Sequence, residues 1–215
     1  MKTVTIPYLK ELHEIDLGCV EENLLLESPV IPIDVVNWSE FPYKPAVAAW
    51  AAYSDEDLYI HYKVCGNTVK AAHKADGSAV HQDSCLEFFM RKVGGDTYMN
   101  FEFNCIGTCD AATRVSKTEK TGLTPEEYAR IRRFTSIVPV EPFEERAFDL
   151  VWTLTVAIPL DLMGLDINDM PQLIEANFYK CGDLTADPHF LSWNPIDLPE
   201  PNFHCPAHFG KVCFK

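Results

Sequence analysis

The sequence has few positive charges for its length. Lys and Arg number 18 against 32 Asp and Glu, which gives a formal net charge of −14. Nucleic-acid phosphates need clustered Lys and Arg for binding, and anionic membrane surfaces attract basic segments for the same reason. We therefore expect no nucleic-acid partner and no membrane partner, whereas a neutral ligand is compatible with this charge.

The sequence also has no long apolar run. No stretch approaches the ~20 apolar residues of a membrane-spanning helix, and residues 1–7 lack the apolar segment of a secretory signal. We expect a cytoplasmic protein, or an extracellular or periplasmic one if a signal has been removed. Without repeats or a linker-like stretch, the 215 residues are predicted to form one domain, 1–215, of unknown oligomeric state.

The eight cysteines lack the regular spacing of a disulfide framework. Most lie in apolar, strand-like runs, where Cys behaves as a small hydrophobic residue. We therefore expect free thiols. Cys105 and Cys109 form the one pair with the spacing of a soft-metal half-site, but no second Cys/His pair matches it, so we expect no metal at this pair.

Common catalytic motifs are missing as well. The sequence contains no G-x-S-x-G, no H-E-x-x-H, no phosphate-binding glycine loop and no dinucleotide fingerprint. Hydrolases, metalloproteases and nucleotide-dependent enzymes of those types are therefore disfavoured.

Alternation of apolar and polar residues dominates what the sequence does contain. In residues 98–106, Met99, Phe101 and Phe103 alternate with polar residues, and the same period of two recurs in 57–64 and 151–158. Further strands are expected at 46–52, 85–91, 134–140, 174–180 and 211–214. The pattern predicts an all-β fold, a two-sheet antiparallel β-sandwich of the immunoglobulin-like or jelly-roll-like kind. We expect its core to include Ile60, Phe101, Phe103, Trp152, Leu154 and Val156, and to include Trp50 and Trp193 as well.

One or two short helices accompany the strands. Thr124, Pro125 and Glu127 form a capping box with Pro at the first helical position, which predicts a helix to about Arg133. A shorter helical turn is expected at 160–164, after Pro159.

Two segments carry a family resemblance. Residues 80–89 read VHQDSCLEFF, and residues 177–210 are dense in aromatic residues, prolines and single polar residues. Together with Ala157-Ile158-Pro159-Leu160 and Leu191-Ser192-Trp193, in this order, they resemble the family 9 carbohydrate-binding modules and their family-9-like relatives, which are related to DOMON domains. The resemblance covers about residues 50–214.

The resemblance implies a β-sandwich that binds sugar chain ends or small oligosaccharides without catalysis. In that family two aromatic rings clamp the sugar and polar side chains bind its hydroxyls. Phe203 takes one aromatic place, and His81 stands at the other, where the family usually has Trp. Glu87 and Asn100 take the places of polar contacts, and Lys180 and Asp183 lie near the rim of the site. The implied carbohydrate site is therefore His81, Glu87, Asn100, Lys180 and Phe203, with no catalytic residue.

Simpler interpretations remain open for these residues. Asn100 and Glu102 fit the solvated face of a strand, and Phe203 fits a core ring. A glycan-acting enzyme would use Glu87 with a second carboxylate, Glu102 or Asp83. A haem or redox relative would need an axial Met and His, for which Met90 or Met99 with His189 are the available pairs. No cofactor is expected otherwise, although Asp55-Glu56-Asp57 could bind Ca²⁺ or form a solvated turn.

Overall fold

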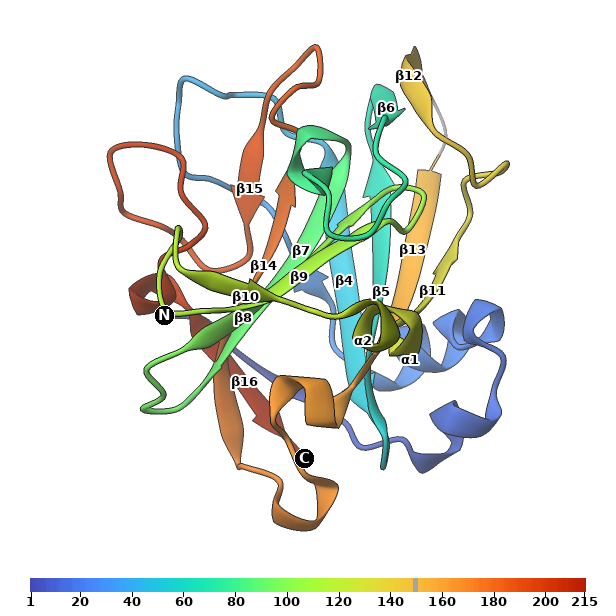
Figure 1. The fold of residues 1–215 in the computed structure, drawn as a ribbon, viewed down its shortest axis with the longest axis vertical. Coiled ribbons are helices and arrows are strands. Elements are labelled where there is room, and N and C mark those ends of the chain that lie inside the picture. Colours follow the sequence, from blue (N-terminus) through green and yellow to red (C-terminus); the bar gives the residue numbers. More distant parts are fainter. Residues whose placement is uncertain (149–150) are drawn as a thin grey trace.

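The computed structural model describes residues 1–148 and 151–215. Two β-sheets pack face to face, and a two-stranded sheet lies at one end (Figure 1). Neighbouring strands of the two sheets pair antiparallel, apart from one parallel pair between the first and last strands. The predicted all-β sandwich is confirmed.

The larger sheet has nine strands and carries the site described below. Its main path runs β1 (Thr3–Ile6), β16 (Gly210–Phe214), β14 (Leu173–Cys181), β7 (Cys85–Lys92), β8 (Tyr98–Asn104), β9 (Cys109–Arg114) and β10 (Lys120–Gly122). β15 (Phe190–Ser192) also pairs with β14, and β3 (Val35–Val36) pairs with β15.

The second sheet has five strands, and it covers the inner face of the first. Its order is β11 (Arg132–Thr135), β13 (Val151–Pro159), β5 (Asp57–Cys65), β4 (Ala46–Tyr53) and β2 (Ile31–Pro32). The two-stranded sheet pairs β12 (Phe143–Ala147) with β6 (Thr68–Ala71).

Helices are short. Among the described residues they are α1 (Glu21–Glu27), α2 (Pro125–Arg130) and six 3-10 turns: η1 (Lys10–Glu14), η2 (Leu17–Cys19), η3 (Val80–Gln82), η4 (Leu160–Met163), η5 (Ile167–Asp169) and η6 (Pro206–His208). The predicted capping box begins α2, and the predicted turn after Pro159 is η4. None of these helices is long and apolar enough to cross a membrane.

The main core fills the space between the two sheets. All six core residues predicted from the alternating pattern are buried there, and so is Trp193. Trp50 differs, because it is only half-buried and packs against a smaller cluster under η1, η2 and α1. Burial of these large aromatic and branched side chains in a close-packed core is the main stabilising contribution to such a fold.

Two element boundaries depart from prediction. Helix α2 ends at Arg130 rather than about Arg133, and β11 occupies 132–135 rather than 134–140. The reason is pairing with β13, since Arg132 lies opposite Ala157 and Thr135 opposite Leu154. Arg132 and Arg133, which the helical pattern alone would place in α2, therefore belong to strand β11.

Strand β8 is buried on both faces. Met99, Phe101 and Phe103 point into the main core, while Asn100 and Glu102 point to the outer face of the larger sheet. The interpretation of Asn100 and Glu102 as a solvated face is wrong, because they are 0% and 3% exposed. Loops from the C-terminal third of the chain and the β9–β10 hairpin cover that face (Figure 1).

Candidate functional site

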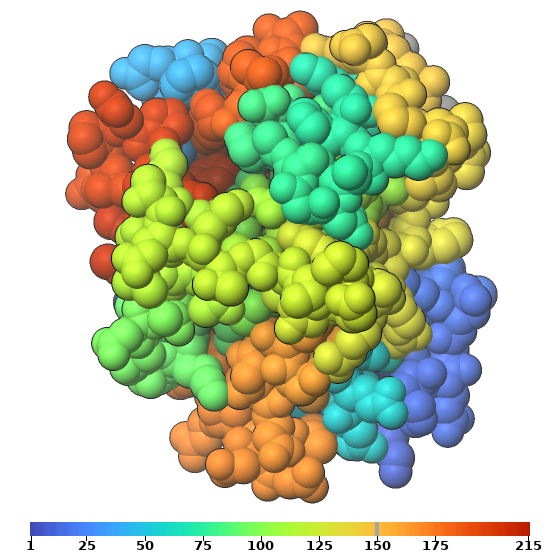
Figure 2. All heavy atoms as spheres, viewed as in Figure 1, coloured from blue at the N-terminus to red at the C-terminus, as the bar shows by residue number. Residues whose placement is uncertain are grey.

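A pocket of about 310 Å³ opens on the outer face of the larger sheet. Figure 2 shows the surface hollowed between the yellow-green hairpin near residues 115–120 and the red loops of the C-terminal third. Its lining combines acidic, basic and aromatic groups: His81, Glu87, Glu102, Asp110, Arg114, Lys117, Lys120, Cys181, Asp183, Phe190, Pro201, Asn202, Phe203 and His204.

A row of three carboxylates crosses the floor of the pocket. Glu87 on β7 lies directly opposite Glu102 on β8, which lies opposite Asp110 on β9. Directly opposed side chains in an antiparallel pair have Cβ atoms about 4.5–5.5 Å apart. The register of three strands therefore places three acidic groups side by side, nearly buried and facing the same cavity.

Burial and mutual repulsion shift the proton affinity of these carboxyls. The pKa of Glu87 is raised well above its ordinary value by burial and by the neighbouring Glu102. Burial also raises the pKa of Glu102, while His81, whose Nδ1 lies 3.7 Å from Glu102 Oε2, partly offsets that rise. In return, the nearby Glu102 carboxylate raises the pKa of His81. The raised pKa values favour protonated carboxyl groups, so the floor can offer hydrogen-bond donors as well as acceptors.

Basic side chains line the opposite end of the row. Lys120 Nζ lies 3.4 Å from Asp110 Oδ2, and Arg114 donates through Nε to Asn100 and through Nη1 to the Lys117 carbonyl, at 2.7 Å for the latter. Asn100 in turn donates to Glu102 Oε1 at 3.1 Å. A continuous polar network thus holds Glu102 and Arg114 in fixed positions under the pocket.

An aromatic wall borders the carboxylate row. The Phe203 ring stacks on Tyr179 with a centroid distance of 4.1 Å and an interplanar angle of 7°. Tyr179 lies opposite Glu87 in the β14–β7 pair, so the stack brings Phe203 next to the acidic floor. Tyr179 covers one face of the Phe203 ring by stacking, and Phe203 also lines the pocket.

The structure brings together three of the five residues predicted from the sequence. His81, Glu87 and Phe203 all line the pocket, from η3, β7 and the loop before η6. Asn100 lies directly beneath it, fully buried, and its contacts are with Glu102 and Arg114. Asn100 is therefore placed to position other contacts rather than to touch a ligand.

Lys180 does not lie in this pocket. Alternation along β14 turns Tyr179 and Cys181 to the outer face and Lys180 to the inner one. Its Nζ donates to the Cys181 carbonyl at 2.7 Å and contacts His189 Nε2 at 2.8 Å. This corrects the expectation that Lys180 binds ligand hydroxyls together with Glu87.

Asp183, expected near the rim, lines the pocket. Several other pocket residues were not identified from the sequence, among them Asp110, Arg114, Lys117 and Lys120. Strand β9 could have been found, since Cys109, Ala111 and Thr113 alternate with Asp110, Ala112 and Arg114. The loop residues carry no comparable pattern.

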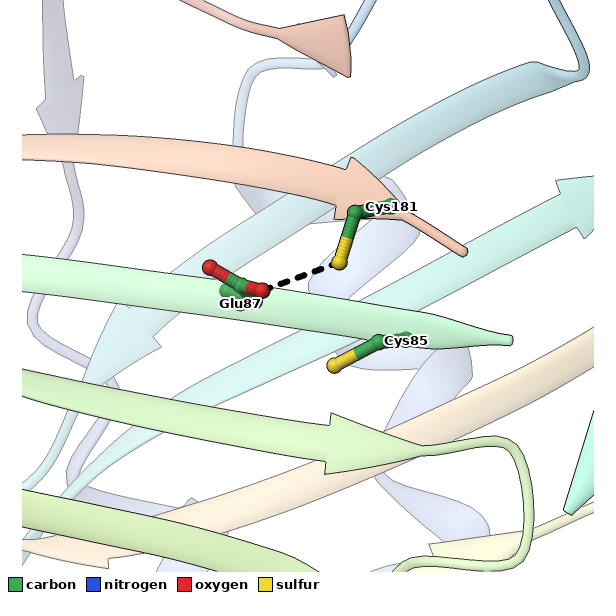
Figure 3. A group of neighbouring side chains, drawn as sticks. All are labelled: Cys85, Glu87 and Cys181. Carbon is green, nitrogen blue, oxygen red and sulfur yellow. Dashed lines mark hydrogen bonds between the residues drawn. The ribbon is translucent and has the colours of Figure 1, made fainter. Parts of the chain in front are cut away.

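Three ligand-type side chains meet at one edge of the pocket (Figure 3). Cys85 and Glu87 lie on the same face of β7, and Cys181 lies opposite Cys85 on β14. Cys181 Sγ donates to Glu87 Oε1 at 3.0 Å. Cys105 and Cys109 instead are buried in the main core, where Cys105 Sγ donates to the Lys70 carbonyl. All eight cysteines are free thiols in the structure.

The other candidate groups from the sequence have structural partners. Asp83 is fully buried and accepts hydrogen bonds from the backbone N–H groups of Ala72 and His73 and from Asn104 Nδ2, so it cannot pair with Glu87 as an acid and base. Glu102 is therefore the only one of the two proposed partner carboxylates that faces Glu87.

The residues considered for haem and for Ca²⁺ lie away from the pocket or already have protein partners. Met90 and Met99 face each other in the main core. Both ring nitrogens of His189 are engaged, by Lys180 Nζ and by the Asp187 carbonyl, so neither is free to bind a haem iron. In the turn 55–57, Asp55 accepts from Tyr8 and Asp57 pairs with Arg132 at 2.8 Å. A Ca²⁺ site there stays a prediction.

Similarity to known proteins agrees with this architecture. The sequence matches carbohydrate-binding family 9 over residues 21–214. No curated protein matches it. A crystal structure of a Bacteroides uniformis protein, provisionally described as carbohydrate-binding, is 34% identical with a TM-score of 0.92, and the match covers 100% of this chain and 99% of that one.

More distant structures share the fold. Family 9 carbohydrate-binding modules of Caldicellulosiruptor kristjanssonii, in complex with glucose and with cellotriose, are 13% identical with TM-scores of 0.64. Those matches cover 100% of this chain and 96% and 94% of the modules. The extent of the family match, together with the 34% identity over the whole chain, shows that the chain belongs to carbohydrate-binding family 9.

Proposed function

We propose that this protein binds sugar chain ends or small oligosaccharides, without catalysis, in the pocket on the outer face of the larger sheet. One observation carries the assignment of the site. The buried carboxyl groups of Glu87 and Glu102 share a single cavity with the ring of Phe203.

This combination suits the chemistry of a sugar. The C–H faces of a pyranose pack on aromatic rings, and its hydroxyls form strong hydrogen bonds with carboxylates and guanidinium groups. Phe203 provides the apolar surface, Glu102 and Glu87 provide acceptors, and Arg114 provides donors at the other end. Among the described residues, Phe203 and Phe190 meet edge to face and form one aromatic wall of the pocket. His81 stands where the family usually has a second ring, so we expect weaker binding than an aromatic clamp gives.

The position of the two glutamates favours binding over hydrolysis. A glycosidase places its two carboxyl groups on either side of the scissile bond. Glu87 and Glu102 are side by side on adjacent strands, so both approach a ligand from the floor of the pocket. They can accept hydrogen bonds from neighbouring hydroxyls, but they do not flank a glycosidic oxygen.

Calorimetric titration with glucose and cellotriose, in the presence of a chelator, tests the aromatic contribution. We expect Phe203→Ala to weaken binding about thirtyfold, since removing a central contact ring commonly costs about 2 kcal/mol. Because Phe203 also packs on Tyr179, Phe203→Leu serves as a second variant that fills the space without an aromatic face. The exposed Phe134, on the other sheet, gives the control Phe134→Ala, which should bind like the wild type.

The same titration tests the floor. Glu102→Gln keeps the hydrogen bond from Asn100 but removes the charge, so we expect about tenfold weaker binding, or about 1.4 kcal/mol. Glu144→Gln, at an exposed position of β12, is the control. Wild-type affinity in both Phe203 variants and in Glu102→Gln would reject the site. Release of glucose from cellotriose during the titration would show hydrolysis and reject the non-catalytic assignment.

A further inference from the structure

We propose that Cys85, Cys181 and Glu87 form a binding site for a thiophilic divalent cation, Zn²⁺ in particular, at the edge of the pocket. Their ligand atoms, two sulfurs and one carboxylate oxygen, all lie within 4.8 Å of one another. The site shares Glu87 with the proposed sugar pocket, but neither family membership nor the proposed function requires a metal ion.

Sheet register builds the site from residues far apart in the sequence. Cys85 and Cys181 are directly opposed in the β7–β14 pair, and Glu87 follows Cys85 by two residues on the same face. Figure 3 shows the three side chains converging from these two strands. Because regular strands fix all three Cα positions, only side-chain rotation is needed to close the set around an ion.

The spacing is close to that of a tetrahedral zinc site. Zn–S bonds of about 2.3 Å and Zn–O bonds of about 2.0–2.2 Å place ligand atoms about 3.4–3.8 Å apart. Cys181 Sγ and Glu87 Oε1 are 3.0 Å apart, and the remaining separations are at most 4.8 Å. A movement of about 1 Å by one thiol brings the set within the range of known sites.

The three groups are buried, so a metal ion must displace protons to bind there. All three are at most 2% exposed, and burial raises the pKa of Cys85 to about 12 and the pKa of Cys181 well above its ordinary value, which favours the protonated thiols. The nearest ammonium, on Lys180, points to the other face of β14. Among the described pocket residues, the other cations lie beside Asp110 and Asn100. A divalent ion would replace the two thiol protons, and the two thiolates and one carboxylate around it would keep one net negative charge.

The site has an entry path from the pocket. Glu87 and Cys181 line the pocket, whereas Cys85 lies behind them. Three protein ligands with one position open to solvent is the arrangement of zinc sites that keep a bound water. Two thiolates with one carboxylate select Zn²⁺ over Ca²⁺ or Mg²⁺, which prefer oxygen ligands alone.

The test begins with the full-length protein, reduced and treated with a chelator. Co²⁺ is added as a spectroscopic probe, and Zn²⁺ binding is measured by competition against it. We expect one Co²⁺ per chain with a thiolate-to-cobalt charge-transfer band, displaced by one equivalent of Zn²⁺. Cys85→Ala and Cys181→Ala should abolish the band, and Glu87→Gln should weaken Co²⁺ binding at least tenfold.

Two controls separate this site from other thiols. Cys105→Ala removes an equally buried thiol on the inner face and should leave the band unchanged. Cys19→Ser/Cys65→Ser removes the exposed thiols and should also retain it. Loss of the band in the exposed-thiol variant, or its survival in Cys181→Ala, would overturn the proposal.

X-ray absorption of the wild-type Zn²⁺ complex gives a measurement that needs no variant to fold. We expect two sulfur scatterers at about 2.3 Å and oxygen scatterers at about 2.0–2.2 Å. A shell without sulfur, or with four sulfurs, would contradict the Cys₂Glu assignment. Sugar titrations of the metal-free protein are a separate measurement, so failure of one proposal does not imply failure of the other.

Discussion

Single residues in this protein are often ionisable and buried. His189 is 3% exposed, accepts from Lys180 Nζ through Nε2, and donates through Nδ1 to the Asp187 carbonyl at 2.7 Å. Burial, and then the nearby Lys180 charge, lower the pKa of His189 to about 3. The neutral ring is therefore the favoured form in the folded protein above about pH 3.

This burial makes stability depend on pH in a defined direction. An unfolded His takes up a proton near pH 6.5, while folded His189 does not until about pH 3. The contribution of neutral His189 is thus complete above pH 6.5 and is lost as the pH falls towards 3. We expect the melting temperature of His189→Gln, which cannot take up a proton, to fall several degrees less than that of the wild type between pH 7.5 and 5.

Differential scanning calorimetry at both pH values makes this comparison. His13→Gln, at a half-buried position on η1, is the matched control and should follow the wild type. Equal losses in His189→Gln and the wild type would show that His189 does not contribute to acid lability.

At the scale of elements, alternation predicted the strands but not what covers each face. Period two places Asn100, Glu102 and Asn104 together, yet nothing in β8 itself says that loops will bury them. The same period separates Lys180 from Tyr179 and Cys181, so its exclusion from the pocket could have been read from β14. The register between strands could not be predicted from the sequence. That register places Glu87 opposite Glu102 and Cys85 opposite Cys181.

Helix α2 is tied to the pocket wall by one side chain. The Tyr128 hydroxyl accepts from the Ala111 backbone N–H at 3.0 Å and donates to the Ala111 carbonyl at 3.1 Å. Ala111 lies on β9, next to Asp110 and close to the β9–β10 hairpin that carries Lys117 and Lys120. The helix therefore holds this hairpin against the sheet.

Removing that hydroxyl should loosen the edge of the sheet. In Tyr128→Phe the buried Ala111 N–H loses its partner, which commonly costs about 1–3 kcal/mol. We expect a loss of stability of that size in urea unfolding, together with faster amide hydrogen exchange at Ala111. Tyr8→Phe removes an exposed hydroxyl that contacts Asp55 and should cost less than about 1 kcal/mol. A Tyr128→Phe variant as stable as Tyr8→Phe would show that the helix does not support β9.

The whole molecule carries its excess negative charge around a pocket for which we propose a neutral ligand. The pocket residues come from segments between His81 and His204, and their acidic side chains are nearly balanced by Arg114, Lys117 and Lys120. The net charge of −14 therefore belongs mainly to the rest of the surface. Self-repulsion of such a charge destabilises the compact state, whereas binding of an uncharged sugar changes no net charge.

Salt should separate these two effects. Raising NaCl from 50 to 500 mM shortens the Debye length from about 14 Å to about 4 Å and screens surface repulsion. We expect the melting temperature to rise by a few degrees, since about 1 kcal/mol corresponds to roughly 2–4 °C for a chain of this size. Calorimetric affinity for cellotriose should change less than about twofold over the same range. A steep fall in affinity with salt would mean that the pocket binds its ligand through net charge, and Arg114, Lys117 and Lys120 would then mark it as a site for an anionic sugar.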